Sequence, residues 1–320
     1  MLCSSVSRFL LLGLSCLSLF IQLGHTALIP IRNRQYDWED NDDTPAPSAS
    51  MPTSSAARST ATPSPSVTPK SSIKSGNTEV IIPYYMYPSD GAWAPLEQLV
   101  TEHSSVRFTV IVNPSSGPGS SSLPDENYRK AVTKLASHSN VLLIGYVSTS
   151  WGDRPISDVE RDIKTYAGWP SVSGDSSFAV RGIFLDEGAA EYNGNKVSYY
   201  TQLNSLIKGS EGLGPNHYVV MNPGTVPDAA YLNIPDSSVI FESPHAQFQE
   251  RVSTGAFEQI KNVDKGRLAS MVTHVPEGTD LSQLVSQQRD ISGHIYLTKL
   301  DTYLAYCPSW SEMARLIGSS

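Results

Sequence analysis

Residues 182–187 read GIFLDE, a short apolar run that ends in two carboxylates. An uninterrupted apolar run of this length is typical of a parallel strand that is buried on both faces. Seven further runs of this kind read VIIPYY (80–85), RFTVIVN (107–113), VLLIGYV (141–147), HYVVMN (217–222), SVIFE (238–242), LASMVT (268–273) and HIYLT (294–298). The sequence therefore predicts a sheet of eight parallel strands within residues 79–320.

Amphipathic helical patterns separate several of these runs. Residues 125–138, 157–169 and 197–207 place apolar side chains on one helical face, and residues 280–290 do so more weakly. Ser157 and Glu160 form the pattern of a capping box at the start of the second helix. Eight strands with crossover helices in about 240 residues match a (β/α)8 barrel of TIM type, with an open doubly wound α/β sheet as the alternative.

Carboxylates follow two of the predicted strands. In a barrel of this type the chemistry occurs at the carboxyl ends of the strands, where Asp186, Glu187 and Glu242 lie. A carboxylate beside an apolar run loses hydration. Fold stability does not need such a carboxylate, whereas general acid–base chemistry does. Because side chains alternate along a strand, Asp186 shares the face of Phe184 and is expected to point inward. The competing interpretation is that each carboxylate caps the following helix.

Polar and aromatic side chains occupy the remaining strand ends. Two carboxylates suit glycosidic cleavage, in which one protonates the leaving oxygen and the other acts as nucleophile or as base for water. Aromatic faces suit sugar rings, although any one of these aromatic residues can instead belong to the core. A lone histidine such as His274 is more often structural than a metal ligand. The candidate substrate-binding residues are Tyr84, Tyr85, Asn113, Tyr146, Asn222 and His274.

Composition and motifs argue against several other classes of protein. The 320 residues carry a net charge of −8, whereas a nucleic-acid binder needs a basic face. The three cysteines, Cys3, Cys16 and Cys307, supply neither a disulfide framework nor a cysteine-rich zinc site. The seven histidines are scattered, and no H-E-x-x-H, G-x-S-x-G or phosphate-loop motif occurs. We therefore expect no metal and no cofactor, which also argues against a metal-dependent polysaccharide deacetylase.

The first 78 residues differ in character from the rest. Residues 9–23 form an apolar stretch after Arg8, which predicts a signal peptide over residues 1–27 or an uncleaved signal anchor. Residues 28–78 include a long Ser-, Thr- and Pro-rich stretch, which is typical of a disordered linker. Residues 79–320 are then expected to be secreted, or tethered at the cell surface by the N-terminal segment, and to be monomeric.

Several motifs within residues 79–320 together resemble one known family. They are PYYMYP (83–88), VNPSSGPG (112–119), GYV (145–147) followed by WGDR (151–154), a segment ending in Trp-Pro at residue 170, GIFLDE (182–187) and NPG (222–224). In this order they resemble the spherulation-specific family 4 proteins, also called spherulin 4-like, whose fungal members form glycoside hydrolase family 135. The resemblance covers roughly residues 80–309.

The resemblance implies a (β/α)8 barrel and an endo-acting α-1,4-N-acetylgalactosaminidase. Its implied substrate is galactosaminogalactan, the cationic exopolysaccharide of filamentous fungi such as Aspergillus. The family's acidic motif on the fourth strand matches Asp186 and Glu187, and its glutamate on the sixth strand matches Glu242. We expect Asp186 to be the nucleophile and Glu242 the general acid/base of a retaining mechanism, while Glu187 tunes the pair or holds a sugar hydroxyl or amide.

Two alternatives to this activity stay open at the level of sequence. The first is a glycosidase of related fold that acts on another amino sugar or on an α-galactan. The second is a non-catalytic cell-wall or spore protein that binds polysaccharide. Such a protein would keep the aromatic side chains but tolerate the loss of Asp186 or Glu242.

Overall fold

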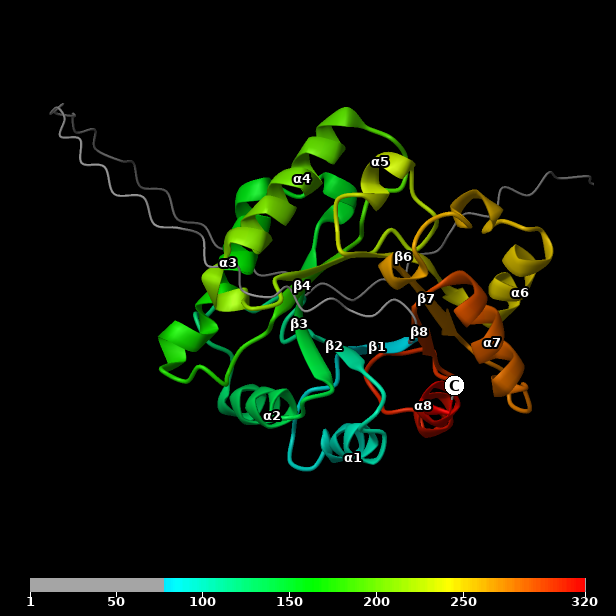
Figure 1. Ribbon diagram of the computed structural model, residues 1–320. Coiled ribbons are helices and arrows are strands. Elements are labelled where there is room, and N and C mark those ends of the chain that lie inside the picture. Colours follow the sequence, from blue (N-terminus) through cyan, green and yellow to red (C-terminus); the bar gives the residue numbers. More distant parts are fainter. Residues whose placement is uncertain (1–77, 320) are drawn as a thin grey trace, which may run out of the picture. The chain divides into compact units, whose positions relative to one another are not determined.

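Eight parallel strands close into a barrel. The computed structural model describes residues 78–319, in which the strands follow one another around the barrel in sequence order (Figure 1). They are β1 (Glu79–Tyr84), β2 (Phe108–Val112), β3 (Val141–Ser148), β4 (Gly182–Asp186), β5 (Tyr218–Met221), β6 (Ser237–Pro244), β7 (Leu268–Thr273) and β8 (His294–Leu297). Each predicted run overlaps one of these strands, so the (β/α)8 barrel is confirmed and the open doubly wound sheet is wrong.

Helices surround the barrel (Figure 1). The α-helices are α1 (Ala94–Glu102), α2 (Glu126–Ala136), α3 (Ile156–Ser173), α4 (Gly194–Gly209), α5 (Ala229–Leu232), α6 (His245–Ser253), α7 (Leu281–Ile291) and α8 (Ser309–Gly318). Short 3-10 helices are η1 (Ser150–Gly152), η2 (Glu211–Leu213), η3 (Glu258–Ile260) and η4 (Lys265–Arg267). The sequence pattern predicted α2, α3, α4 and α7, and no range was predicted for α1, α5, α6 or α8.

Short polar side chains begin several helices by accepting hydrogen bonds from backbone N–H groups of the first turn. These N–H groups have no partner within the helix, so a side-chain oxygen at this position stabilises the helix start. The residues that act in this way at α2, α4, α5 and α7 are Asp125, Asn193, Asp228 and Asp280.

The capping box predicted at Ser157 and Glu160 is wrong. The helix α3 begins at Ile156, directly after Pro155, and Ser157 is already inside its first turn. The fixed φ of proline suits this helix start, so no side-chain cap is present there. Glu160 instead pairs with Lys164 at 3.1 Å on the helix surface.

The strands are covered on both faces. Every residue of β2 and β7 is buried, because one face of each strand lines the barrel interior and the other packs under helices. Close approach of α3 to β3 needs a glycine, since a Cβ at Gly145 would lie 2.7 Å from the ring of Tyr166. Polar side chains that could bind or react with a substrate are therefore expected at the two ends of the barrel.

The carboxyl end of β6 is shaped by a bulge. The register with β7 shifts between Val239 and Phe241. Phe241 packs outward against Phe248 of α6, with ring centroids 5.3 Å apart. The next residue, Glu242, consequently points to the barrel mouth.

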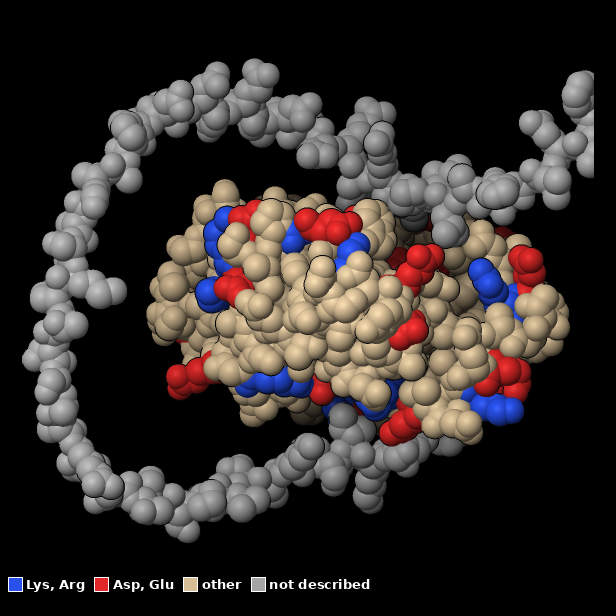
Figure 2. All heavy atoms as spheres, turned by 90° about the horizontal axis from the view of Figure 1, so that it is seen from above, with Lys and Arg blue, Asp and Glu red and all other residues tan. Residues whose placement is uncertain are grey.

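The predicted signal or anchor segment (1–27) and linker residues 28–77 lie outside the described residues. Within residues 78–319, no helix is long and apolar enough to cross a membrane. On the face shown in Figure 2, basic and acidic side chains are interspersed around the edge of the described part, and most of the surface between them is uncharged.

Candidate active site

Two carboxylates and one amide meet at the carboxyl end of the barrel. The Nδ2 of Asn222, directly after β5, donates to Oδ1 of Asp186 at 2.7 Å and to Oε2 of Glu242 at 2.5 Å. Two contacts of these lengths to one nitrogen place the two carboxylate oxygens at most about 5 Å apart. The ends of three neighbouring strands, β4, β5 and β6, thus supply the centre of the site.

Tyrosines surround this carboxylate pair. The hydroxyl of Tyr146, on β3, donates to Asp186, and that of Tyr303, between β8 and α8, donates to Oε1 of Glu242 at 2.6 Å. Tyr85 packs edge-on against both tyrosine rings, with centroid distances of 5.5 and 5.6 Å. Each carboxylate therefore has its own tyrosine donor in addition to the amide donor that both share.

The electrostatics of the site favour a single proton on the pair. Burial and, to a smaller extent, the facing charge of Glu242 raise the pKa of Asp186 to about 7. Two carboxylates this close ionise one after the other, so the pair keeps one proton near neutral pH. Burial also raises the pKa of Tyr146 and Tyr303 far above the usual range for tyrosine, so both hydroxyls remain donors.

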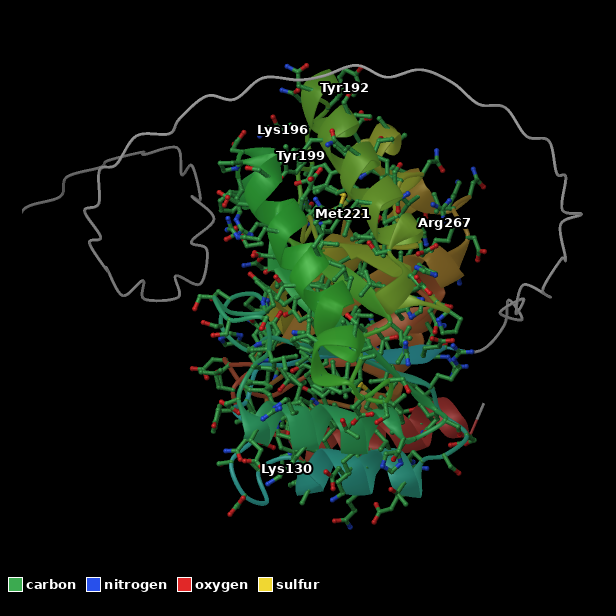
Figure 3. The ribbon with its side chains drawn as sticks, turned by 90° about the vertical axis from the view of Figure 1, so that its left-hand side faces the viewer. Lys130, Tyr192, Lys196, Tyr199, Met221 and Arg267 are labelled. Carbon is green, nitrogen blue, oxygen red and sulfur yellow. The ribbon has the colours of Figure 1, made fainter. Side chains whose placement is uncertain are left out.

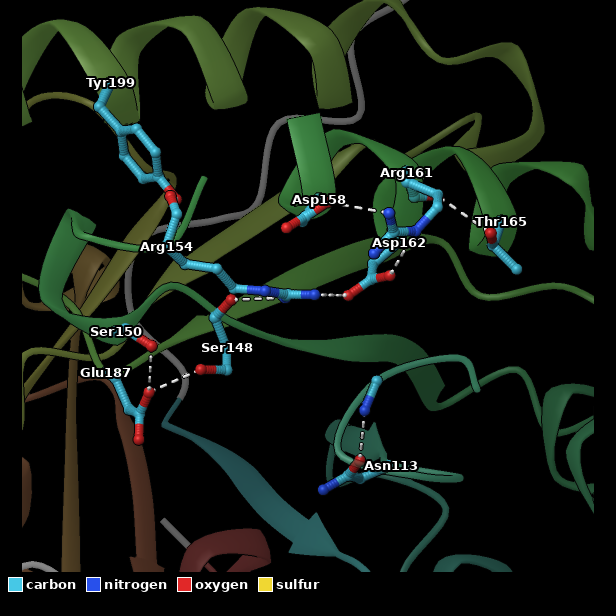
Figure 4. A network of polar contacts seen from close by, with 11 residues as sticks. Asn113, Ser148, Ser150, Arg154, Asp158, Arg161, Asp162, Thr165, Glu187 and Tyr199 are labelled. Atoms are coloured by element: carbon cyan, nitrogen blue, oxygen red, sulfur yellow. Dashed lines mark hydrogen bonds and ion pairs between the residues drawn. The ribbon is translucent and has the colours of Figure 1, made fainter. Parts of the chain in front are cut away.

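Glu187 follows Asp186 but has different partners. Its φ is 52°, a left-handed conformation that a residue with a side chain rarely adopts. Its Oε2 accepts a hydrogen bond from the hydroxyl of Ser148 at 2.6 Å (Figure 4), and its carbonyl accepts one from the N–H of Trp151 at 2.6 Å. The two adjacent carboxylates consequently diverge: Asp186 faces Glu242, and Glu187 faces the loop after β3.

A network of polar contacts fixes that loop. Arg154 donates to the carbonyl of Ser148 at 2.9 Å and pairs with Asp162 of α3 at 2.6 Å (Figure 4). Tyr199 donates to the carbonyl of Arg154 at 3.0 Å, and Figure 3 shows Tyr199 beside Lys196 near the beginning of α4. The serine that holds Glu187 is therefore anchored to two helices.

The loops after β4 and β5 are in backbone contact. The N–H of Gly188 donates to the carbonyl of Asn222 at 2.7 Å, and a Cβ at residue 188 would lie 3.0 Å from the carbonyl carbon of Asn222. The Oδ1 of Asn222 accepts from the N–H of Gly224 at 3.0 Å. These contacts leave the amide nitrogen of Asn222 directed at the carboxylates.

The structure does not bring Tyr84 to this centre. Its ring packs against Trp93 and Trp310, with centroids 5.4 and 6.1 Å away, on the helix-covered side of β1. Side chains alternate along a strand, so Tyr85 takes the mouth side and Tyr84 the opposite side. Tyr84 is a core residue, in contrast to its prediction as a substrate-binding residue.

Asn113 and His274 lie at strand ends but make no contact with the carboxylate pair. The Oδ1 of Asn113 accepts from the N–H of Gly117 at 2.9 Å and shapes the loop after β2. His274 is exposed, and its Nδ1 lies 2.9 Å from the hydroxyl of its neighbour Thr273. Their predicted role in substrate binding stays a prediction.

Tyr303 and Ser148 were not among the predicted site residues. Ser148 follows directly on the predicted third strand, and Tyr303 lies in a loop well beyond the end of β8. The rule that chemistry lies at strand ends cannot find Tyr303. The aromatic-rich segment YLAYCPSW at residues 303–310 is the signal that could have indicated it.

Within residues 78–319, no group of three His, Cys, Asp or Glu side chains is placed to hold a metal ion.

A (β/α)8 barrel with two facing carboxylates and several tyrosines at the carboxyl ends of its strands has the architecture of a glycoside hydrolase. Comparison with known families defines the protein more closely. The model of the spherulation-specific family 4 matches residues 79–317, and the chain belongs to this family.

Individual relatives agree with this assignment. The chain is 39% identical over 167 residues to Spherulin-4 of Physarum polycephalum, in a match that spans 51% of this chain and 44% of that protein. The crystal structure of Aspergillus clavatus Sph3 in complex with GalNAc is 45% identical and superposes with a TM-score of 0.73, covering 76% of this chain and 98% of Sph3. An endo-β-1,4-mannanase from Thermotoga petrophila shares the fold, with a TM-score of 0.50 at 13% identity over 77% of each chain.

Proposed function

We propose that this protein is an endo-acting glycoside hydrolase that cleaves α-1,4-linked N-acetylgalactosamine in galactosaminogalactan with retention of configuration. One observation carries the proposal: a single amide holds the oxygens of Asp186 and Glu242 at most about 5 Å apart. Retaining glycosidases separate their carboxyl groups by about 5–5.5 Å, whereas inverting enzymes need ~6.5–9.5 Å to admit a water. Similarity to Sph3, whose structure was solved with GalNAc, supports the choice of sugar.

We assign the nucleophile to Asp186 and the acid/base to Glu242. Asp186 accepts hydrogen bonds from Tyr146, Asn222 and the backbone N–H of Glu187. Glu242 accepts side-chain hydrogen bonds from Tyr303 and Asn222. Donors favour the ionised form of the carboxylate that they face, so the three donors around Asp186 support its role as the nucleophile, which reacts in the ionised form.

Hydrolysis then takes two steps. An oxygen of Asp186 attacks C1 of the sugar while the bond from C1 to the bridging oxygen breaks, and Glu242 gives its proton to that oxygen. Water next attacks C1 and gives a proton to Glu242, and the bond between C1 and Asp186 breaks. Glu187 binds Ser148 and Ser150 through Oε2 alone, which leaves Oε1 to accept a hydrogen bond from a sugar hydroxyl or amide.

The first test is release of reducing ends from purified galactosaminogalactan by the full chain. We expect release by the parent and a loss of at least about 1,000-fold in Asp186→Asn and Glu242→Gln, with circular dichroism unchanged. Gln98→Ala, on the surface of α1, is the matched control and should cleave like the parent. Binding of polymer without any cleavage would instead identify a polysaccharide-binding protein.

Azide tests the two roles. In Glu242→Ala the glycosyl-enzyme still forms, so azide should release an α-glycosyl azide from an activated aryl α-glycoside. In Asp186→Ala azide replaces the missing nucleophile directly, and the product should be the β-azide. The reverse pattern would exchange the two assignments. Proton NMR of the earliest hydrolysis products should show the α-anomer first, and a β-anomer would contradict retention.

We also propose that the enzyme acts outside the cytosol, as a secreted or membrane-tethered protein. The basis is the apolar stretch at residues 9–23, which is followed by a Ser-, Thr- and Pro-rich linker. N-terminal sequencing of the mature protein distinguishes the two forms. A start near residue 28 would indicate a cleaved signal peptide, and an intact N-terminus in the membrane fraction would indicate an anchor.

A further inference from the structure

Trp151 lies in a strained turn after β3 and is half-exposed. Three consecutive residues, Ser150, Trp151 and Gly152, have positive φ values of 46°, 55° and 84°. Such a conformation is unfavourable for a residue with a side chain and persists only when its surroundings enforce it. Trp151 nevertheless keeps 49% of its surface exposed, and its indole forms no hydrogen bond or ring contact within residues 78–319.

The turn is rigid because the candidate site holds it. The N–H of Trp151 donates to the carbonyl of Glu187 at 2.6 Å, and the hydroxyl of Thr149 donates to the carbonyls of Asp186 and Glu187 at 2.9 Å. On its other side, Lys196 of α4 pairs with Asp153 at 2.9 Å. Figure 4 shows Ser150, next to Trp151, beside the carboxylate of Glu187. The backbone of Trp151 is thus held at the barrel mouth by the same segment that carries the carboxylates.

Exposed apolar side chains concentrate at this end of the barrel. The exposed residues in the connections that follow strands are Tyr87, Trp151, Tyr192 and Leu304. Within the described part of the chain, only Val172 of α3 is a large exposed hydrophobic residue elsewhere. A half-exposed aromatic ring contributes less to folding stability than a buried one, and the strained backbone offsets part of that contribution. A flat apolar ring in this setting is suited to a flat apolar partner.

We propose that Trp151 is a stacking platform for a pyranose ring of the polymer, in a subsite adjoining the cleavage position on the side of Glu187. This proposal rests on the proposed function, because the polymer supplies the ring. The C–H face of a pyranose packs on the indole, and any free ammonium group of the amino sugar gains cation–π attraction from the same ring. Substrates long enough to reach Trp151 should therefore bind and react better than shorter ones.

Binding is tested by tryptophan fluorescence, without cleavage. Trp93, Trp169 and Trp310 are 0–3% exposed and report little on ligand, and Trp38, outside the described residues, is silenced by Trp38→Phe. In the full chain carrying this change and Asp186→Asn, a hexasaccharide of N-acetylgalactosamine should shift the emission to shorter wavelength. Adding Trp151→Ala should abolish the shift. A shift that persists without Trp151, or no shift at all, would overturn the platform.

Kinetics provide the second test. Trp151→Ala should lower kcat/KM on the hexasaccharide about 10-fold more than on the disaccharide, Trp151→Tyr should recover most of the loss, and Val172→Ala should behave like the parent. An unchanged dependence on substrate length in an active Trp151→Ala enzyme would overturn the inference and leave the proposed function intact. A fluorescence shift without any hydrolysis by the parent would support the platform while refuting the hydrolase.

Discussion

Asn222 separates two groups that repel each other. One amide nitrogen donates to both Asp186 and Glu242, and the amide oxygen is held by the N–H of Gly224. The sequence placed Asn222 among the substrate-binding residues, whereas its contacts in the structure are with the carboxylates. A neutral donor between two acids lowers the cost of charge on either one without neutralising the pair.

Tyr303→Phe tests the donor to Glu242. The change removes one hydroxyl and keeps the ring that packs against Tyr85. A hydrogen bond to a charged group contributes ~1.5–3 kcal/mol, so kcat should fall about 10- to 100-fold. Because loss of the donor makes ionisation of the Asp186–Glu242 pair less favourable, the acidic limb of the pH–rate profile should move to higher pH. Tyr306→Phe, outside the site, is the control, and an equal loss there would point to packing instead.

Asp186→Asn should stabilise the protein while it abolishes activity. The pKa of Asp186 is about 7 in the folded protein against 3.8 as the ordinary value. Because the folded pKa is the higher one, the free energy of unfolding of the parent falls as pH rises from about 4 to about 7. The amide variant does not titrate and should be more stable by about 2–4 kcal/mol at pH 8. Denaturant unfolding at pH 4 and pH 8 measures this, and equal stability at pH 8 would contradict it.

At the level of elements, strained backbone concentrates in the loops that build the mouth. Five of the six non-glycine residues with positive φ in residues 78–319 follow β2, β3, β4 or β7, and the sixth, His217, directly precedes β5; their φ values lie between 46° and 55°. Strain of this kind is retained where a side chain must leave the regular alternation of a strand. Glu187 shows the effect, because its backbone turns the carboxylate from the β4 face to the loop after β3. The five residues in the loops at the mouth are Ser116, Ser150, Trp151, Glu187 and His274.

Gly188→Ala tests the contact between the loops after β4 and β5. The added methyl group would lie 3.0 Å from the Asn222 backbone, so the loop must move and displace the amide. We expect a stability loss of ~1–3 kcal/mol and a fall in kcat of about 10-fold or more. Gly209→Ala, which meets nothing within 4 Å at the end of α4, is the matched control. Full activity in Gly188→Ala would show that the amide position is not critical.

In the whole molecule, the two ends of the barrel hold different buried titratable groups. The carboxyl end holds the acidic pair, and the amino end holds His294, where β8 closes on β1. The Nε2 of His294 lies 2.9 Å from the carbonyl of Gly266 and 3.2 Å from the hydroxyl of Tyr218. Its Nδ1 lies 3.7 Å from Glu79, which pairs with Arg107 at 3.1 Å. The closure of the barrel thus depends on a buried imidazole.

His294→Gln tests how much folding stability the protein loses at low pH because His294 is buried where the barrel closes. Burial lowers the pKa of His294 below 6.5, although the charge of Glu79 opposes the shift. The unfolded chain then takes up a proton more readily, so the parent loses stability as pH falls through 6.5 toward the folded pKa. Glutamine at this position does not titrate, so the Tm of the variant should fall less than that of the parent between pH 7.5 and pH 5.5. A larger acid loss in the variant than in the parent would show that His294 is charged when folded.

The sequence by itself determined the barrel and the residues at its mouth. Eight apolar runs of strand length admit few other arrangements, because parallel strands buried on both faces must be covered by crossover helices. Asp186, Tyr146 and Asn222 end such runs, so their meeting at one edge follows from connectivity alone. The same logic could have excluded Tyr84, since two adjacent strand residues cannot both face the mouth.

Only the tertiary structure decided how these groups interact. Tyr303 lies far along a loop, and its bond to Glu242 depends on where that loop packs. The left-handed backbone of Glu187 and the half-exposed Trp151 are set by contacts across loops rather than by local preference. Periodicity reports which face of a strand is buried, because burial repeats along the chain. Hydrogen bonds between distant loops leave no such period, so their geometry emerges only when the barrel has closed.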